Sequence, residues 1–359
     1  MIEMSHMTVI EDTETLTEHP SPQRARPRHR LRDALSFRSI SALYIFAALF
    51  VLFSLWVPST FLDGDTWKAM LDDQAITALT AVSLVIPLSA GVFNLAIGSQ
   101  VAVGSILSAW LLSQHLPIPA TVTLTLVAGA AIGLATGLLI VRARIDSFIA
   151  TLGVSSVLLA ITTWISDGQQ ILDLGAAYQE LATGQLFGIT HPVYFLVLVA
   201  LAVWYVLERT PAGRRVYATG GNLDAARLAG VRTSTTVVLS LIACGVIASA
   251  AGTLVSSRLA TGDPSIGPGY LLPAFAAAFL GSTQFRGGRY NVWGTVIAVY
   301  VLATGVKGLQ LAGAPVWIPD LFNGLALLLA VGMAVRRDAT GRTSAIARLL
   351  RRRRASQQA

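Results

Sequence analysis

Side chains that commonly carry out chemistry are few in this sequence, and their spacing forms no catalytic or metal-binding constellation. The five histidines are scattered over the ends of the chain and of its apolar segments, with no H-E-x-x-H pattern. The two lysines, Lys68 and Lys307, do not follow a glycine, which excludes a phosphate-binding G-x-x-x-x-G-K-[ST] loop. We therefore predict no catalytic residue, no metal ion and no nucleotide or other cofactor bound by this chain.

Ionisable residues within apolar segments are equally few. Asp146 and Asp320 lie at segment ends, where a solvated cap is the simplest role, so no segment carries the acidic or histidine relay of a proton-driven transporter. Lys307 lies well inside a segment, and it either extends along its apolar stem to the outer interface or lines a translocation path. These features indicate a translocation path whose driving energy comes from elsewhere.

Composition indicates the class of fold that must position these residues. Of the 359 residues, 54% are apolar and 13% charged, whereas soluble domains carry about 25% charged residues. The charges gather in clusters between apolar stretches of about 17–21 residues, the length that crosses a hydrocarbon core. This pattern excludes a soluble enzyme, a disordered protein and, with Cys244 as the single cysteine, a disulfide scaffold. The predicted fold class is all-α, a polytopic transmembrane helical bundle.

We predict about ten spans from the apolar stretches. The clear ones are Ile40–Val57, Ala75–Leu95, Thr121–Val141, Ser147–Ile165, Pro192–Leu207, Thr235–Val255, Val292–Leu311 and Trp317–Val335. Two shorter segments, Val101–Leu116 and Leu271–Leu280, are flanked by glycine (Gly98 and Gly281). They are predicted to be broken or tilted helices buried among the others.

Arginine and lysine are strongly biased to one side of this arrangement. With both termini on the same side, all 26 cationic residues except Lys68, Arg258 and Lys307 are assigned to that side. Cytoplasmic loops are enriched in Lys and Arg, so both termini are predicted to be cytoplasmic. The expected organisation is a disordered basic extension over 1–38, a transmembrane domain over 39–336 and a basic tail over 337–359. The basic ends are expected to contact the anionic lipids of the bilayer, with no nucleic acid as partner.

Glycines indicate two local features of the spans. Gly129, Gly133 and Gly137 recur every four residues and form one stripe along a helix, where another backbone can approach closely. Gly91 and Gly98 flank the sequence G-V-F-N-L-A-I-G-S within an otherwise apolar region, and we predict unwound backbone between them.

The longest internal cytoplasmic stretch contains Gly213–Val231, with the sequence GRRVYATGGNLDAARLAGV. We expect a turn over Thr210–Gly213 and then a short helix that Asn222 caps and Gly230 ends, with Asp224 in its first turn. A short helix flanked by arginine suits docking to a cytosolic partner. From the residues alone, a plain linker helix is an equal alternative.

The segment Gly213–Val231 resembles the G-R-x-V-Y-A-x-G-G-N-x-x-A-A-R-L-x-G-[IV] pattern of ABC-type monosaccharide permeases, the membrane subunits of ribose, xylose, arabinose and galactose importers. Ala90–Ser99 resembles the G-G-x-D-L-S-V-G-S motif of this family, and Ser147–Gly153 resembles its P-F-I-A-T-L-G motif. Gly267–Tyr270, with Ala274–Gly281 and residues 287–288, resembles its G-x-G-Y…A-A…G-G-T-S…G-G-R-G stretch. The resemblance extends over about residues 40–335.

The resemblance implies a permease subunit in the inner membrane of a bacterium, with a second permease subunit (an identical copy or a paralogue), separate ATPase subunits that bind ATP and Mg²⁺, and an extracytoplasmic sugar-binding protein. The residues implied in coupling to the ATPase are Gly213, Tyr217, Gly220, Gly221, Asn222, Ala225, Ala226, Arg227, Leu228 and Gly230. Those implied in the substrate pathway are Phe93, Asn94, Ser99 and Thr151.

The sequence departs from the family pattern at two positions of the second motif. Asn94 replaces the usual acidic residue and Ala96 replaces the following serine. A carboxamide keeps hydrogen bonding without charge, and it costs less to bury than a carboxylate. Two alternatives stay open at this point. One is a permease of the same superfamily for nucleosides or branched-chain amino acids, and the other is a secondary transporter that acts alone.

Overall fold

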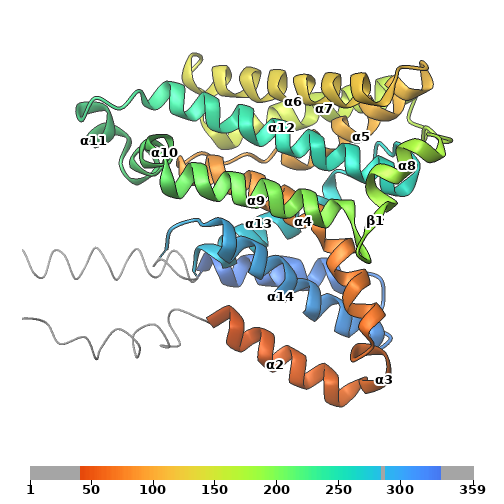
Figure 1. Cartoon of the computed structure of the whole chain (residues 1–359). Helices are drawn as coiled ribbons and strands as arrows, with labels where there is room; N and C mark the ends of the chain where they lie inside the picture. Colours follow the sequence, from red (N-terminus) through yellow and green to blue (C-terminus); the bar gives the residue numbers. More distant parts are fainter. Residues whose placement is uncertain (1–40, 284–287, 333–359) are drawn as a thin grey trace, which may run out of the picture. The chain divides into compact units, whose positions relative to one another are not determined.

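The computed structural model describes residues 41–283 and 288–332, which are mostly helical (Figure 1). The predicted extensions over 1–38 and 337–359 lie outside these residues. The helices are α2 (Ser41–Trp56), α3 (Pro58–Phe61), α4 (Gly64–Ser89), α5 (Ile97–Ser113), α6 (Ile118–Val141), α7 (Ser147–Ser166), α8 (Ala176–Thr183), α9 (His191–Arg209), α10 (Pro211–Gly221), α11 (Leu223–Leu228), α12 (Thr233–Leu259), α13 (Pro268–Ser282) and α14 (Val292–Leu311). A last helix covers Ile318–Gly332, and strands β1 (Gln185–Leu186) and β2 (Ile189–Thr190) form a small antiparallel hairpin.

Six of the described helices are long and apolar enough to cross a membrane: α4, α6, α7, α9, α12 and α14. Four shorter apolar helices, α2, α5, α13 and Ile318–Gly332, correspond to the remaining predicted segments. The described chain therefore has the composition of a multi-pass membrane protein. The count of ten spans and the side on which the termini lie stay predictions.

Helix α4 differs most from its predicted span, because it begins at Gly64 instead of Ala75 and ends at Ser89 instead of Leu95. The Asp63 side chain caps its first turn by accepting a hydrogen bond from the Asp65 backbone N–H at 3.2 Å. The helix thus continues through polar residues that a search for apolar stretches leaves out.

The core of the described chain is built around α4. Every residue from Ala75 to Ala90 is buried, and α9, α12, α13 and α14 all contact this helix (Figure 1). A helix that is apolar on all sides is stable only when neighbouring helices surround it, so α4 is the helix against which the others are positioned.

The predicted glycine stripe on α6 packs against α12. A Cβ atom on Gly129 would lie 2.5 Å from the carbonyl oxygen of Gly245, and one on Gly133 would lie 2.7 Å from the Cα of Ile242. Contacts this short leave no space for a side chain, so the two helices meet backbone to backbone. The prediction of a packing stripe is confirmed.

The two short helices α5 and α13 are largely buried, as predicted, and each follows a non-helical segment. Residues 90–96 separate α4 from α5, and this confirms the unwound backbone expected between Gly91 and Gly98. Residues 260–267 separate α12 from α13. The two helices begin against one another, because a Cβ atom on Gly98 would lie 2.6 Å from the carbonyl oxygen of Gly267.

Tyr178 fastens the short helix α8 to α5 and α12. Its hydroxyl lies 3.0 Å from Ser108 Oγ, 2.7 Å from Ser256 Oγ and 3.0 Å from the Thr253 carbonyl oxygen. The Ser257 hydroxyl donates in return to the backbone carbonyl of Tyr178 at 2.6 Å. Burial raises the pKa of the Tyr178 phenol above its ordinary value, so the group stays protonated and able to donate.

The α6–α12 contact predicts unequal effects for two helical glycines. Gly133→Ala inserts a methyl group against the backbone of α12, and we expect a loss of about 1–3 kcal/mol in unfolding free energy. Gly153→Ala in α7 is the matched control, because its added methyl group meets no atom within 4 Å. Thermal unfolding of the purified chain in detergent compares them, and equal melting temperatures for the two variants would contradict the contact.

Candidate functional site

The segment implied in ATPase coupling folds as two short helices. Thr210 is extended, Pro211 begins α10, and Gly213 is buried where a Cβ atom would lie 2.5 Å from the Cα of Leu207. The expected turn over Thr210–Gly213 is therefore wrong beyond Thr210, since proline at the first position favours immediate helix formation.

The short helix that follows agrees with the prediction. Asn222 interrupts the helical backbone, and its Oδ1 accepts a hydrogen bond from the Ala225 backbone N–H at 2.9 Å. Helix α11 then runs over Leu223–Leu228 and is followed by Gly230 at φ +83°. The predicted cap and glycine stop are confirmed, and the helix is fixed at both ends.

The outer face of α11 presents apolar surface. Leu228 is 90% exposed and Leu223 is 41% exposed, whereas Ala226 is buried at 4%. The Arg227 Nε donates to the Thr233 hydroxyl at 3.0 Å, which ties α11 to the start of α12. An almost fully exposed leucine on an ordered helix is a suitable contact for another protein.

The inner face of α10 is attached to the segment before α14. The Tyr217 hydroxyl donates to the Tyr290 carbonyl oxygen at 2.9 Å, and the Arg289 guanidinium lies 4.5 Å from the centre of the Tyr217 ring. Cations over aromatic rings at this range attract one another. Tyr217 therefore attaches α10 to the segment that precedes α14.

Gly220, near the end of α10, lies directly against the break between α4 and α5. A Cβ atom on Gly220 would lie 2.9 Å from the Gly91 backbone nitrogen, and one on Gly91 would lie 3.1 Å from the Gly220 Cα. At Gly221, by contrast, an added Cβ atom would meet nothing within 4 Å. The two regions that the sequence singled out separately are thus in backbone contact.

Asn94 lies within the break and is fully buried. Its Nδ2 donates to Gln100 Oε1 at 3.1 Å and to the Cys244 sulfur at 3.3 Å. Asn94 Oδ1 and Gln100 Nε2 have no hydrogen-bond partner among the residues that the structure describes. The site therefore holds unused, uncharged hydrogen-bonding capacity inside an apolar surrounding.

Two of the other predicted pathway residues, Thr151 and Ser99, form hydrogen bonds that attach the break and α5 to α7. The Leu95 backbone N–H donates to the Thr151 hydroxyl at 3.1 Å, and the Ser99 hydroxyl lies 2.6 Å from that of Ser155. Phe93 differs from them, because the residue is 40% exposed and the centre of its ring lies 6.4 Å from the centre of the Phe279 ring in α13. Sequence reasoning missed Gln100 and Ser155, although a glutamine within an apolar segment is itself a signal.

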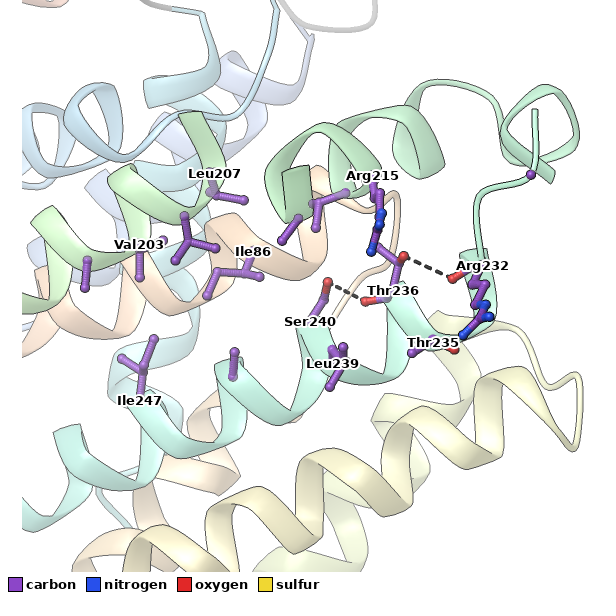
Figure 2. Close-up of a pocket in the computed structure, with 16 residues that line it drawn as sticks. Ile86, Val203, Leu207, Arg215, Arg232, Thr235, Thr236, Leu239, Ser240 and Ile247 are labelled. Carbon is purple, nitrogen blue, oxygen red and sulfur yellow. Dashed lines mark hydrogen bonds between the residues drawn. The ribbon is translucent and has the colours of Figure 1, made fainter. Parts of the chain in front are cut away.

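Two cavities open near these elements. The smaller, of about 400 Å³, lies between α4, α13, α14 and the last helix, and its polar lining residues include Asp73, Tyr270 and Asn323. The larger, of about 710 Å³, lies between α9, α10 and α12 (Figure 2). Neither of these two cavities is lined by the four predicted pathway residues.

Charged groups play a limited part in this arrangement. Asp73 pairs with the guanidinium of Arg258, and Lys307 is half-buried one turn before the end of α14. The two roles considered for Lys307 both stay predictions. Within residues 41–283 and 288–332, no three acidic, histidine or cysteine side chains are grouped to hold a metal ion.

These features define a class of protein, a multi-pass helical membrane protein in which a buried break between two helices contacts the short helix α10. Residues 69–331 match the family described as the permease component of the branched-chain amino acid transport system, and the chain belongs to this permease family. The resemblance to permease subunits of ABC importers found in the sequence is confirmed. No solved structure matches the chain.

Several curated relatives are sugar permeases. The ribose import permease of Bacillus subtilis strain 168 is 33% identical over 79% of this chain and 88% of its own length. The ribose import permease of Escherichia coli K12 is 30% identical over 82% of this chain and 92% of its own length. The L-arabinose permease of Azospirillum brasilense is 28% identical over 87% of this chain and 92% of its own length.

The polar cluster predicts a specific effect of changing Asn94. Asn94→Leu removes the donor that pairs with Gln100 Oε1, so a buried acceptor is left without a partner. We expect a loss of about 1–3 kcal/mol in unfolding free energy. Thermal unfolding measures it, and restoration of stability by Gln100→Leu in the same chain would identify the orphaned acceptor as the cause. An unchanged melting temperature for Asn94→Leu would contradict the pairing.

Proposed function

We propose that this chain is the transmembrane subunit of an ABC importer in a bacterial inner membrane, forming the translocation path for a monosaccharide. A second permease subunit completes the path, separate ATPase subunits bind and hydrolyse ATP, and an extracytoplasmic binding protein delivers the sugar. The observation that supports this most directly is the backbone contact between Gly220 and Gly91. This contact joins the segment of α10 and α11 to the break that contains Asn94.

The chemistry of the polar cluster favours an uncharged, hydroxyl-rich solute. The side chains around the break are amides and hydroxyls, which pair with sugar hydroxyls as both donors and acceptors. An amino acid carries two opposite charges, and the described residues of this cluster offer no charged group to pair with them. The curated relatives named for ribose and L-arabinose favour the same substrate class.

In the proposed mechanism, closure of the ATPase dimer moves α11 and α10 together. Gly220 pushes against Gly91 at van der Waals contact, and Tyr217 moves the segment before α14. The break then shifts α5 relative to α7, and the polar groups around Asn94, Ser99 and Thr151 become accessible from alternate sides. This chain supplies the path and the linkage, and ATP and Mg²⁺ stay on the partner subunits.

Docking is tested at Leu228. Leu228→Asp places a charge at a 90% exposed position, so the fold is kept while an apolar contact with the ATPase is lost. We expect co-purification of the ATPase and sugar uptake both to be abolished. Ala226→Asp is a poorer test because Ala226 is buried, and a carboxylate there would disturb α11 itself.

Phe187→Asp is the matched control for docking. Phe187 is 92% exposed between β1 and β2, on the side predicted to be extracytoplasmic. The change to aspartate is the same, and the ATPase should stay bound. Retention of the ATPase by Leu228→Asp would overturn the assignment of α11 as the docking helix.

Transmission is tested at the two adjacent glycines. Gly220→Ala inserts a methyl group 2.9 Å from the Gly91 nitrogen, whereas Gly221→Ala inserts one into open space. We expect Gly220→Ala to keep ATPase docking but reduce sugar uptake by about tenfold or more, since about 1–3 kcal/mol of strain enters the linkage. Gly221→Ala should transport as the unchanged chain does. Equal uptake by the two variants would contradict transmission through this contact.

The secondary transporter stays as the second candidate, and a direct measurement separates it from the first. The purified chain in liposomes, without ATPase subunits, should not accumulate sugar against a gradient. Uphill uptake driven by an ion gradient alone would overturn the ABC assignment.

A further inference from the structure

The cavity of about 710 Å³ lies between helices on the side of the coupling segment, and no step of the proposed mechanism uses it. Its walls come from α9, α10, α12 and Ile86 of α4 (Figure 2). At one end its lining is aliphatic, with Val203, Leu207 and Ile247. At the other end two arginines, Arg215 and Arg232, approach it together with the hydroxyls of Thr235 and Thr236 (Figure 2).

The arginines are available to bind an anion. Both are exposed, and neither guanidinium has an ion pair or hydrogen bond to another residue within 41–283 and 288–332. The two threonine hydroxyls differ in availability, because Thr236 Oγ1 donates to the Arg232 carbonyl at 3.1 Å and Thr235 is exposed. Two unpaired guanidinium groups at the mouth of an apolar groove favour a ligand with an acidic head and a hydrocarbon tail.

The length of the groove fits one leaflet of a bilayer. Along α12, the lining runs from Arg232 to Ile247, a separation of about 22 Å at a rise of about 1.5 Å per residue. One leaflet of a bilayer, with its headgroup region, is about 20–22 Å thick. The arginines therefore lie at the depth of lipid headgroups when the aliphatic walls face acyl chains. The groove also opens between exposed apolar side chains, Val206 of α9 and Leu239 of α12.

We propose that this groove binds an anionic phospholipid of the cytoplasmic leaflet, with its phosphate between Arg215 and Arg232 and one acyl chain along α9 and α12. The proposal rests on the cytoplasmic placement of α10 and α11 in the proposed function. The bound lipid contacts α10 on the face beside Val216, and so it supports the helix that carries Tyr217 and Gly220. The composition of the inner leaflet then becomes a requirement for an ordered coupling segment.

The test measures lipid binding by the purified full-length chain without ATPase subunits or nucleotide. Native mass spectrometry counts phosphatidylglycerol retained from mixed micelles, with phosphatidylcholine as the zwitterionic comparison. The double variant Arg215→Gln with Arg232→Gln should weaken retention of one phosphatidylglycerol by about twenty-five-fold, about fivefold for each arginine. Retention of phosphatidylcholine should not change.

Two further variants separate the groove from general surface charge. Arg209→Gln with Arg214→Gln removes the same charge from nearby positions that do not line the cavity, and it should keep the lipid. Ala243→Phe fills the apolar wall while both arginines remain, and it should lose the lipid. Size-exclusion profiles and melting temperatures establish that each variant is folded.

Three outcomes would overturn the proposal. Equal loss in the two double-arginine variants would assign the effect to net charge. Displacement by inorganic phosphate or glycerol phosphate would identify a site for a soluble anion. Absence of the lipid from a wild-type permease dimer, with its presence in the monomer, would make the groove an interface between permease subunits. Because no ATPase takes part, these outcomes are distinguishable from failure of the Leu228 docking test.

Discussion

A bilayer offers no water to pair with backbone N–H and C=O groups, and this constraint determines where the helices of this chain can end. Residues 90–96 interrupt a buried region, and several of their backbone donors have local partners: the Val92 N–H donates to the Pro87 carbonyl, and the Leu95 N–H donates to the Thr151 hydroxyl. Such a break is stable only deep inside the protein, where neighbouring residues supply hydrogen-bond partners for its backbone groups. The glycines Gly91 and Gly98 allow neighbouring backbone to approach the break closely. The backbone-to-backbone packing and the break in the helix therefore depend on each other.

In the proposed importer, the same contacts let the segment of α10 and α11 act on the break. A long flexible side chain absorbs a small displacement by changing rotamer, whereas two backbones at van der Waals contact do not. Gly220 meets the break in this way, and Tyr217 adds a hydrogen bond to the segment before α14. In the proposed importer, a movement driven by ATP hydrolysis on the partner subunits therefore reaches the buried polar cluster through few intervening residues.

Much of this arrangement could be predicted from local sequence. Gly91 and Gly98 predicted the break, the stripe from Gly129 predicted a close helix contact, and Asn222 predicted the start of a short helix. Each of these three predictions depends on the conformation or size of residues that are close together in the sequence. The early start of α4 was missed because its first turns are polar, and α10 was missed because its glycines disfavour helix. Contacts between distant segments, such as Gly220 with Gly91 and Asn94 with Gln100 and Cys244, depend on tertiary packing that periodicity does not encode.

In the proposed importer, the cluster around Tyr178 is the fixed end of this linkage. Its hydroxyl binds α5 and α12 at once, and Ser257 returns a bond to α8, so the ends of these helices far from α11 are held as one unit. Helices that are held at one end move most at the other end. Rocking of α5 and α12 driven from the docking side would therefore separate these helices most near that side and least near α8. The extracytoplasmic gate of such a transporter would then have to be opened by helices that Tyr178 does not contact.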